Sequence, residues 1–206
     1  MGSKSTIIAM GQGPSHEIFR GEPVVDLTKS KELAARVLGG PPEPSGWVPL
    51  DLGIWPEPDT VCAASLAGFE IVCDQRLALE RPSELTDWVL KFAPDRSVYA
   101  VFMHSVVDWA AFAVWERGVL RRSLSLLSDK GVLEDIGDRY SFEEPYWRGD
   151  WSIDFEPDYP LPFHPIELGN EALHHFFGIY LEGSHDDSDV DFEDIEVPAF
   201  RVGERR

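Results

Sequence analysis

The feature that most constrains the fold is Ser97–Leu126, the most densely apolar stretch of the chain. Its first part, Ser97–His104, is apolar at both odd and even positions, as in a strand buried on both faces of a sheet. Trp109–Trp115 and Val119–Leu126 follow and are separated by only three residues. This spacing, with a glycine just before the second segment, predicts a β-hairpin beside the buried strand.

The length of the hairpin loop decides which residues share a face of the sheet. A three-residue loop, 116–118, pairs Trp115 with Val119 and is the predicted closure. A two-residue turn would instead place Arg122 with the tryptophans. In the predicted register, the face that could stack a planar ligand or anchor a partner carries Trp109, Trp115 and Arg121. Burial of this face inside the protein is the simpler interpretation.

A second hairpin is predicted around a two-residue turn, Ala67–Gly68, which places Cys62 opposite Cys73. The N-terminus lacks the basic start, long apolar middle and cleavage site of a signal peptide. We therefore expect a cytoplasmic protein whose two cysteines are buried free thiols, not a disulfide.

Length and composition predict one globular domain spanning 1–206, because 206 residues with 43% hydrophobic content can bury a full core. No run of 18 apolar residues is present, so no membrane association is expected. Hairpins dominate the predicted connections. The predicted class is α+β, with a mostly antiparallel sheet of roughly five to seven strands and about three helices.

Capping and periodicity place the helices at Asp26–Leu38, from Arg81 onward, and from an Asn170 cap to Gly183. Further strands are predicted at Lys4–Met10, Trp47–Ile54, Gly131–Ile136 and Val197–Val202. The last of these contains Pro198, which predicts an edge position because proline cannot donate to a neighbouring strand.

Residues 140–165 contain eight aromatic residues and five prolines, which suits neither a regular helix nor a central strand. So much aromatic surface requires cover, so the segment is predicted to be an ordered arm. We expect it to lie on the hairpin face that carries Trp109 and Trp115, with Trp147 mostly buried.

The net charge of −19 is concentrated near the C-terminus, where residues 141–206 hold seventeen acids and four bases. An acidic loop is predicted at 182–196. This charge disfavours nucleic-acid binding, which needs lysine and arginine to neutralise phosphates. It would suit a basic protein partner, although solubility alone accounts for it.

Four segments of the chain resemble a family of uncharacterised bacterial proteins, of the high-GC Gram-positive type and about 200 residues long. They are Tyr99–Leu126, Val72–Leu85, Pro145–Trp147 and Leu161–Gly169. The resemblance implies a single cytoplasmic bacterial domain. No established activity comes with it, and it assigns no functional residue.

His104, Ser105 and Asp108 are the candidate catalytic residues, since they combine a nucleophile, a base and an acid where the buried strand ends. Adjacent residues of an extended chain point to opposite faces, so His104 and Ser105 diverge unless the chain turns there. A polar turn that caps local backbone groups is the favoured interpretation.

No metal site and no cofactor are predicted. His174 and His175 are neighbours on a predicted helix and point about 100° apart, so they cannot chelate one ion together. His164 lies between a phenylalanine and a proline and is expected to be packed.

Two functions follow from these patterns. The first hypothesis is a non-catalytic cytoplasmic domain that binds a basic protein partner through its acidic C-terminal third. The alternative is an enzyme or sensor that binds a small molecule in a pocket near His104–Asp108.

Overall fold

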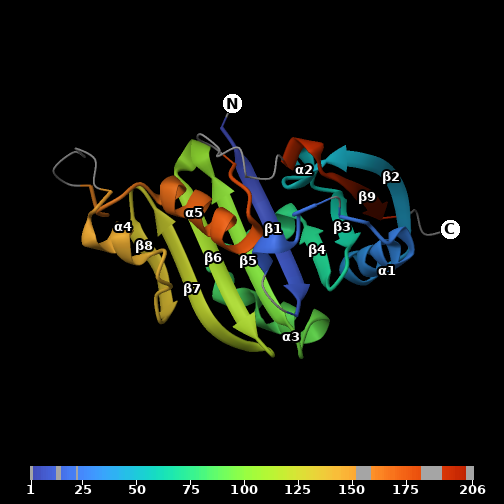
Figure 1. Ribbon diagram of the computed structural model, residues 1–206, viewed down its shortest axis with the longest axis horizontal. Helices are drawn as coiled ribbons and strands as arrows, with labels where there is room; N and C mark the ends of the chain where they lie inside the picture. The colour runs from blue at the N-terminus through green and yellow to red at the C-terminus, as the bar shows by residue number, and fades with distance from the viewer. Residues whose placement is uncertain (1, 13–14, 22, 152–158, 182–191, 203–206) are drawn as a thin grey trace.

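The computed structural model describes residues 2–12, 15–21, 23–151, 159–181 and 192–202, which form one open antiparallel sheet with helices on both faces (Figure 1). The strands are β1 (Lys4–Gly11), β2 (Pro42–Pro49), β3 (Thr60–Ser65), β4 (Phe69–Cys73), β5 (Ser97–His104), β6 (Trp109–Glu116), β7 (Val119–Leu127), β8 (Gly131–Gly137) and β9 (Glu196–Val202). The α-helices are α1 (Leu27–Leu38), α2 (Leu50–Gly53), α3 (Thr86–Phe92), α4 (Glu144–Arg148) and α5 (Pro165–Phe177). Short 3-10 turns are η1 (Ser15–Glu17), η2 (Gln75–Leu77), η3 (Pro82–Leu85), η4 (Ser105–Val107) and η5 (Phe192–Asp194).

The α+β class is confirmed, but the sheet has nine strands, not five to seven. Their order is β2-β9-β3-β4-β1-β5-β6-β7-β8. The prediction missed β2 because its three prolines hide the strand pattern, and it placed a strand over Trp47–Ile54 instead. That predicted strand breaks at Pro49, where α2 begins.

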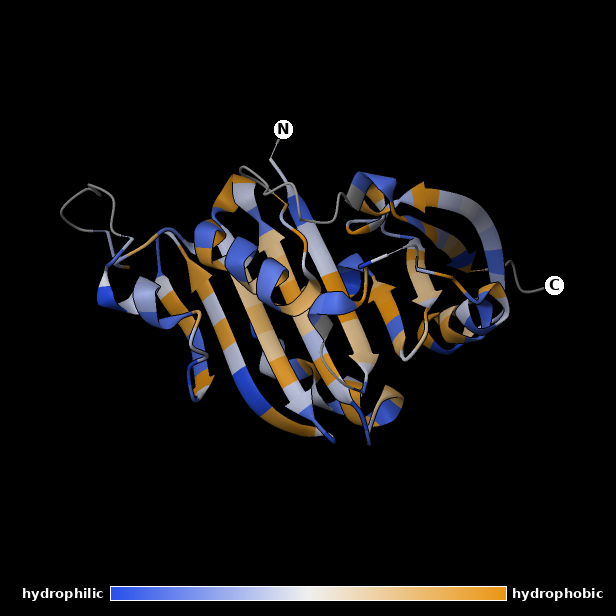
Figure 2. Ribbon diagram, in the orientation of Figure 1, coloured by the Kyte–Doolittle hydropathy of each residue, from blue (hydrophilic) through white to orange (hydrophobic). Residues whose placement is uncertain are grey.

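Strand β1 lies in the middle of the sheet, between β4 and β5. It pairs along its whole length with β5, from Lys4 opposite His104 to Gly11 opposite Ser97. Every side chain from Ser5 to Met10 is buried, as expected for a central strand covered on both faces, and the last four of these residues are apolar. Figure 2 shows the apolar residues gathered on β1, β5 and β6.

Two apolar clusters lie on opposite faces of the sheet. Helix α5 covers one face, where Gly169 lets the helix approach β5 and β6 so closely that a Cβ would lie 2.9 Å from Ala110. On the other face, α1 and α3 supply Leu33 and Val89 to the second cluster. Both helices are amphipathic, so each buries its apolar stripe.

The last strand, β9, lies between β2 and β3 and not at an edge as predicted. Pro198 is tolerated there because the pairing of β9 with β3 ends at Ala199, while Pro198 faces Trp47 of β2. The proline therefore lies beyond the last pair with β3, where no donor is needed. The proline-rich β2 is the edge strand on this side of the sheet.

The cysteine hairpin forms as predicted. Leu66 and Phe69 close the turn, and Cys62 pairs with Cys73. Both are buried free thiols. Burial raises the pKa of Cys62 to about 12 and raises that of Cys73 well above its ordinary value, with the neighbouring Cys62 and Asp74 adding to the effect at Cys73.

The register of the β6–β7 hairpin differs from the prediction. Arg117 and Gly118 both have positive φ and form a two-residue turn, so Glu116 pairs with Val119. A bulge then follows, at which Arg121 is the extra residue between two cross-strand pairs. Beyond the bulge, Arg122 faces the same side as Phe112, the face that the sequence pattern reserves for apolar residues.

The buried Arg122 is accommodated because its guanidinium is fully paired. It donates to both carboxylate oxygens of Glu143, at 3.0 and 2.6 Å, and neither side chain is exposed. It also donates to Asp135 and to the carbonyl of Ile136, at 3.1 Å from the latter. Burial lowers the pKa of Arg122, but the bonds to Glu143 and Asp135 outweigh burial and raise it overall.

This ion pair fixes the start of the aromatic arm. The Glu143 carboxylate also accepts a bond from the Tyr140 backbone N–H at 2.8 Å. The arm was predicted to lie on the face with Trp109 and Trp115, and that is wrong. Its rings pack on the opposite face against α5, as in the contact of Phe142 with Phe176 at 5.8 Å.

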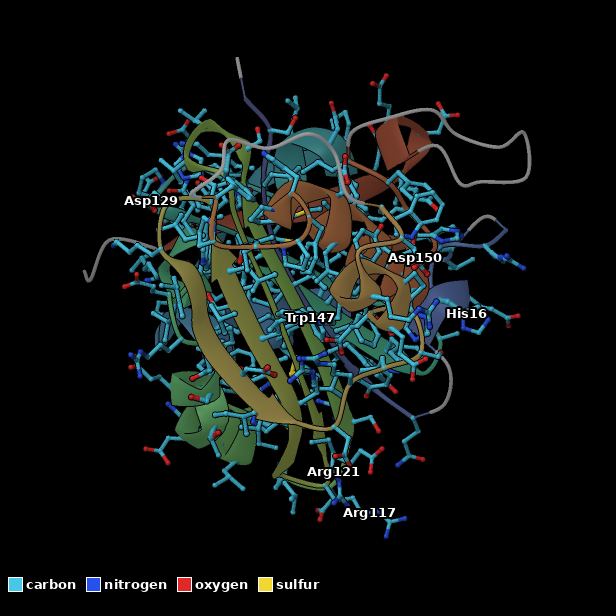
Figure 3. All side chains as sticks on the ribbon, turned by 90° about the vertical axis from the view of Figure 1, so that its left-hand side faces the viewer. His16, Arg117, Arg121, Asp129, Trp147 and Asp150 are labelled. Carbon is cyan, nitrogen blue, oxygen red and sulfur yellow. The ribbon has the colours of Figure 1, made fainter. Side chains whose placement is uncertain are left out.

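The arm also contains a short helix, α4, which the prediction excluded. The helix can form because Pro145 occupies its first turn, where proline is tolerated. Trp147 is half-buried, packed edge-on to Phe163 at 5.0 Å with the Arg139 guanidinium 4.1 Å above its ring (Figure 3). Trp151 is 59% exposed, contrary to the expectation that it would be covered. Residues 152–158 of the arm, and 182–191 of the predicted acidic loop, lie outside the described residues.

Helix α5 begins five residues before the predicted Asn170 cap. Its actual N-cap is His164, whose ring accepts from the Ile166 N–H, and Pro165 occupies the first helical position. Asn170 lies inside the helix and accepts from the Leu181 N–H at 3.1 Å. Gly178, in the left-handed conformation, ends the helix before the predicted Gly183.

The buried ion pair yields a prediction about stability. Glu143→Ala leaves Arg122 charged and buried, so we expect the free energy of unfolding to fall by about 3–5 kcal/mol in urea titrations. Arg122→Met combined with Glu143→Leu removes both charges and should recover most of that loss.

The matched control is the exposed pair of Arg121 with Glu116, 3.1 Å apart at the hairpin end. Glu116→Ala should cost less than about 1 kcal/mol, because solvent already screens this pair. A Glu143→Ala protein as stable as the Glu116→Ala protein would show that the arm is not anchored by the buried pair.

Candidate functional site

A cavity of about 400 Å³ opens at the end of the sheet where β1 begins, β5 ends and β6 begins, the upper end in Figure 1. Its volume falls within the range of small-molecule sites, about 300–1,000 Å³. Its walls are mostly apolar, with two tryptophans from distant parts of the chain. The lining residues are Trp55, Ala78, Glu80, His104, Val107, Trp109 and Leu127.

Trp109 forms a rigid wall of this cavity. It is the cross-strand partner of His104 and is 9% exposed. Its ring is parallel to that of Phe102 within 5°, and its Nε1–H donates to the Ser125 hydroxyl at 3.0 Å. Because both the ring plane and the polar edge are already held, Trp109 presents a preformed aromatic surface.

Trp55 supplies the second aromatic wall. It follows α2, is half-buried, and its ring centre lies 6.2 Å from that of His104. The Lys4 ammonium group is 5.4 Å from the centre of the Trp55 ring. Lys4 reaches this position because the β1–β5 register places it directly opposite His104.

His104 and Glu80 are the two titratable residues in a mostly apolar wall. Partial burial lowers the pKa of His104 below the ordinary value, and the nearby Lys4 charge lowers it further. Both effects favour the neutral imidazole, which has one nitrogen that donates and one that accepts a hydrogen bond. Such a group can orient a ligand that the tryptophans hold.

Asp108 does not face His104. It ends η4 with a φ of 52°, and its carboxylate lies 3.5 Å from Nε2 of His164. Nδ1 of His164 accepts from the Ile166 N–H, so Nε2 is the protonated nitrogen and points to Asp108. This contact joins η4 to the start of α5 and leaves His164 without a free lone pair for proton abstraction.

The three candidate catalytic residues thus do not assemble into a triad. The chain turns after His104 through η4, whose first residue, Ser105, donates its backbone N–H to the Ser3 carbonyl at 3.0 Å. Of the three side chains, that of His104 lines the cavity and that of Asp108 is paired elsewhere. The predicted polar turn describes Ser105 and Asp108 better than a catalytic arrangement does.

Trp115 and Arg121 do not form a ligand-binding face with Trp109. Trp115 is completely buried, and its Nε1–H donates to the Thr86 hydroxyl of α3 at 3.1 Å. Arg121 lies near the start of β7, beside Arg117. Asp129, which follows the cavity end of this strand, lies far from both (Figure 3). Trp115 is therefore a core residue and only Trp109 reaches the cavity.

The histidines of α5 diverge, as their spacing predicts. His174 stacks on Tyr180 at 4.3 Å, whereas His175 contacts Phe142 at 4.5 Å. In the part of the chain that the structure describes, no three His, Cys, Asp or Glu side chains are grouped so that they could hold a metal ion. None of the described helices has the length and apolar character needed to cross a membrane.

Comparison with known proteins places the chain in a family. The DUF6928 family, a family of unknown function, matches residues 4–200. The chain belongs to this family. No curated protein and no solved structure matches it. The cavity accordingly has to be interpreted from its own geometry.

Trp55 and Lys4 are site residues that sequence reasoning missed. Lys4 begins a predicted strand, but nothing in the sequence gives the register that brings it to His104. Trp55 lies in a proline-rich segment, Pro41–Pro58, of which only Trp47–Ile54 is predicted to be a strand. A tryptophan flanked by prolines and acids was the available signal, since a large ring in such a segment needs cover.

The Lys4–His104 proximity can be tested by NMR titration. We expect the imidazole of His104 to titrate below its ordinary value of about 6.5, and Lys4→Met to raise that pKa because a neighbouring positive charge is removed. Lys31→Met, on the exposed surface of α1, is the control and should leave the titration unchanged. An unaltered pKa in Lys4→Met would place Lys4 away from the cavity.

Proposed function

We propose that this protein is a cytoplasmic small-molecule-binding domain whose ligand is a planar aromatic compound. The observation that carries the proposal is that Trp55 and Trp109, from separate elements, line one cavity together with His104. Rings that face a common space can hold a planar ligand by stacking, which contributes about 0.5–1.5 kcal/mol beyond area burial for each aromatic pair. Two buried free thiols fit a reducing compartment.

Binding is a better interpretation than catalysis for this cavity. Among the described residues no ion pair joins an acid to His104, because Asp108 pairs with His164 and Glu80 with Lys130. Ser105 belongs to the backbone turn. A neutral histidine among apolar walls supplies a directional hydrogen bond, which is how apolar sites acquire specificity.

The hypothesis of a basic protein partner remains a prediction. The acidic third of the chain supports it by charge, and Glu193 and Asp194 of η5 are exposed there. Most of the acidic run, 182–191, lies outside the described residues. Co-purification at low and high salt tests it, because an electrostatic partner should dissociate as salt rises.

The aromatic site is tested with indole, an uncharged planar probe, by heteronuclear NMR of the tryptophan side chains. We expect saturable shifts at the Nε1–H signals of Trp55 and Trp109, and Trp55→Leu should weaken binding about tenfold, as the loss of one well-placed ring does.

Trp151→Leu provides the matched control, since Trp151 is 59% exposed and does not line the cavity. It should bind indole as the unmodified protein does. Shifts spread over all seven tryptophans without saturation, or equal affinity of Trp55→Leu and Trp151→Leu, would contradict the proposal.

A further inference from the structure

The charges around the cavity are not balanced. Lys4 is positioned over the Trp55 ring and, within the described residues, forms no ion pair with a carboxylate. The acid among the lining residues, Glu80, already has the Lys130 ammonium group 4.0 Å away. In the part of the chain that the structure describes, Lys4 is thus a positive charge without an ion-pair partner, although the net charge of the chain is −19.

This position of Lys4 differs from that of an ordinary surface lysine. Lys4 is the first residue of β1, the central strand of the sheet, so pairing with β5 fixes the backbone of Lys4. The ammonium group lies beside an aromatic wall and close enough to His104 to lower the pKa of the imidazole. A ligand held between the tryptophans would therefore have both a fixed cation and a neutral imidazole at one edge of its ring.

We infer that the site selects planar aromatic ligands that carry a carboxylate, with Lys4 as the group that recognises the acid. This inference rests on the proposed function, because Lys4 contributes only if the ring is held by Trp55 and Trp109. The carboxylate pairs with Lys4, and the imidazole of His104 donates a second hydrogen bond to it. A ligand with an amino group in the same place is rejected by the Lys4 charge.

Binding of an acid is then linked to protonation of His104. The charged groups that face this imidazole are Lys4 of β1 and Glu80 after η2, while Asp108 is directed to His164. A bound carboxylate adds a negative charge beside His104 and favours its protonated form. Affinity for the acid should therefore rise as the pH falls from about 7.5 to about 6, where the ligand carboxylate is still ionised.

The test compares three probes with the same ring: indole, indole-3-carboxylate and the cationic tryptamine, each titrated calorimetrically against the full chain. We expect the carboxylate to bind most tightly and tryptamine most weakly. Lys4→Gln should weaken binding of the carboxylate about threefold to fivefold, the upper range for a solvent-accessible ion pair, and leave indole unchanged. Lys31→Gln, on the exposed surface of α1, is the control and should alter neither.

The outcomes separate the two proposals. If none of the three probes binds, the proposed function fails. If indole binds but the carboxylate binds no more tightly, or if Lys4→Gln weakens indole and the carboxylate equally, the aromatic site stands and the selection of acids is overturned. Tightest binding of tryptamine would also overturn it and would assign recognition to Glu80. Circular dichroism of Lys4→Gln establishes that the fold is intact.

Discussion

The pairing of β1 with β5 holds this structure together. Four strands, β2, β9, β3 and β4, lie on one side of β1, and the meander β5–β8 lies on the other. The first strand of the chain joins these two groups into one sheet, through eight paired positions from Lys4 to Gly11. The same ladder places Lys4 beside His104, so the fold and the candidate site depend on a single register.

A second constraint acts on the face of the sheet that α5 covers. Arg122, Asp135 and Glu143 form an ion-paired network under the start of the aromatic arm. A buried ion pair contributes little net stability compared with apolar packing, but it strongly penalises any arrangement that separates its partners. It therefore specifies where the arm begins and keeps its rings on the α5 face, away from the cavity.

Local chemistry made several elements predictable. The cysteine hairpin followed from Ala67-Gly68 and the alternation on both sides of it, and α1 followed from the Asp26 cap and the terminal Gly39. The predicted edge position of β9 was wrong, because Pro198 alone does not reveal that the pairing of the neighbouring strand β3 with β9 stops before it reaches the proline. Local rules describe single elements well, and they fail where a distant strand decides the outcome.

The β6–β7 register shows the same limit more sharply. The sequence pattern favours a three-residue loop, because a two-residue turn would place Arg122 with the tryptophans. The residue that accommodates Arg122 is Glu143, which lies 21 residues later in the chain. For the candidate site, the place at the end of a buried strand predicts His104, and the face of the predicted hairpin predicts Trp109. Trp55 and Lys4 could not be found, because only the assembled sheet brings residues separated by about half the chain to one cavity.

The most direct test of the candidate site is a crystal structure of the protein soaked with indole-3-carboxylate. The account predicts that the ring lies between Trp55 and Trp109, with its carboxylate within about 4 Å of the Lys4 ammonium group, the range of an ion pair. A ring bound elsewhere on the protein, with the cavity beside His104 occupied by water alone, would contradict the assignment of this cavity as the functional site.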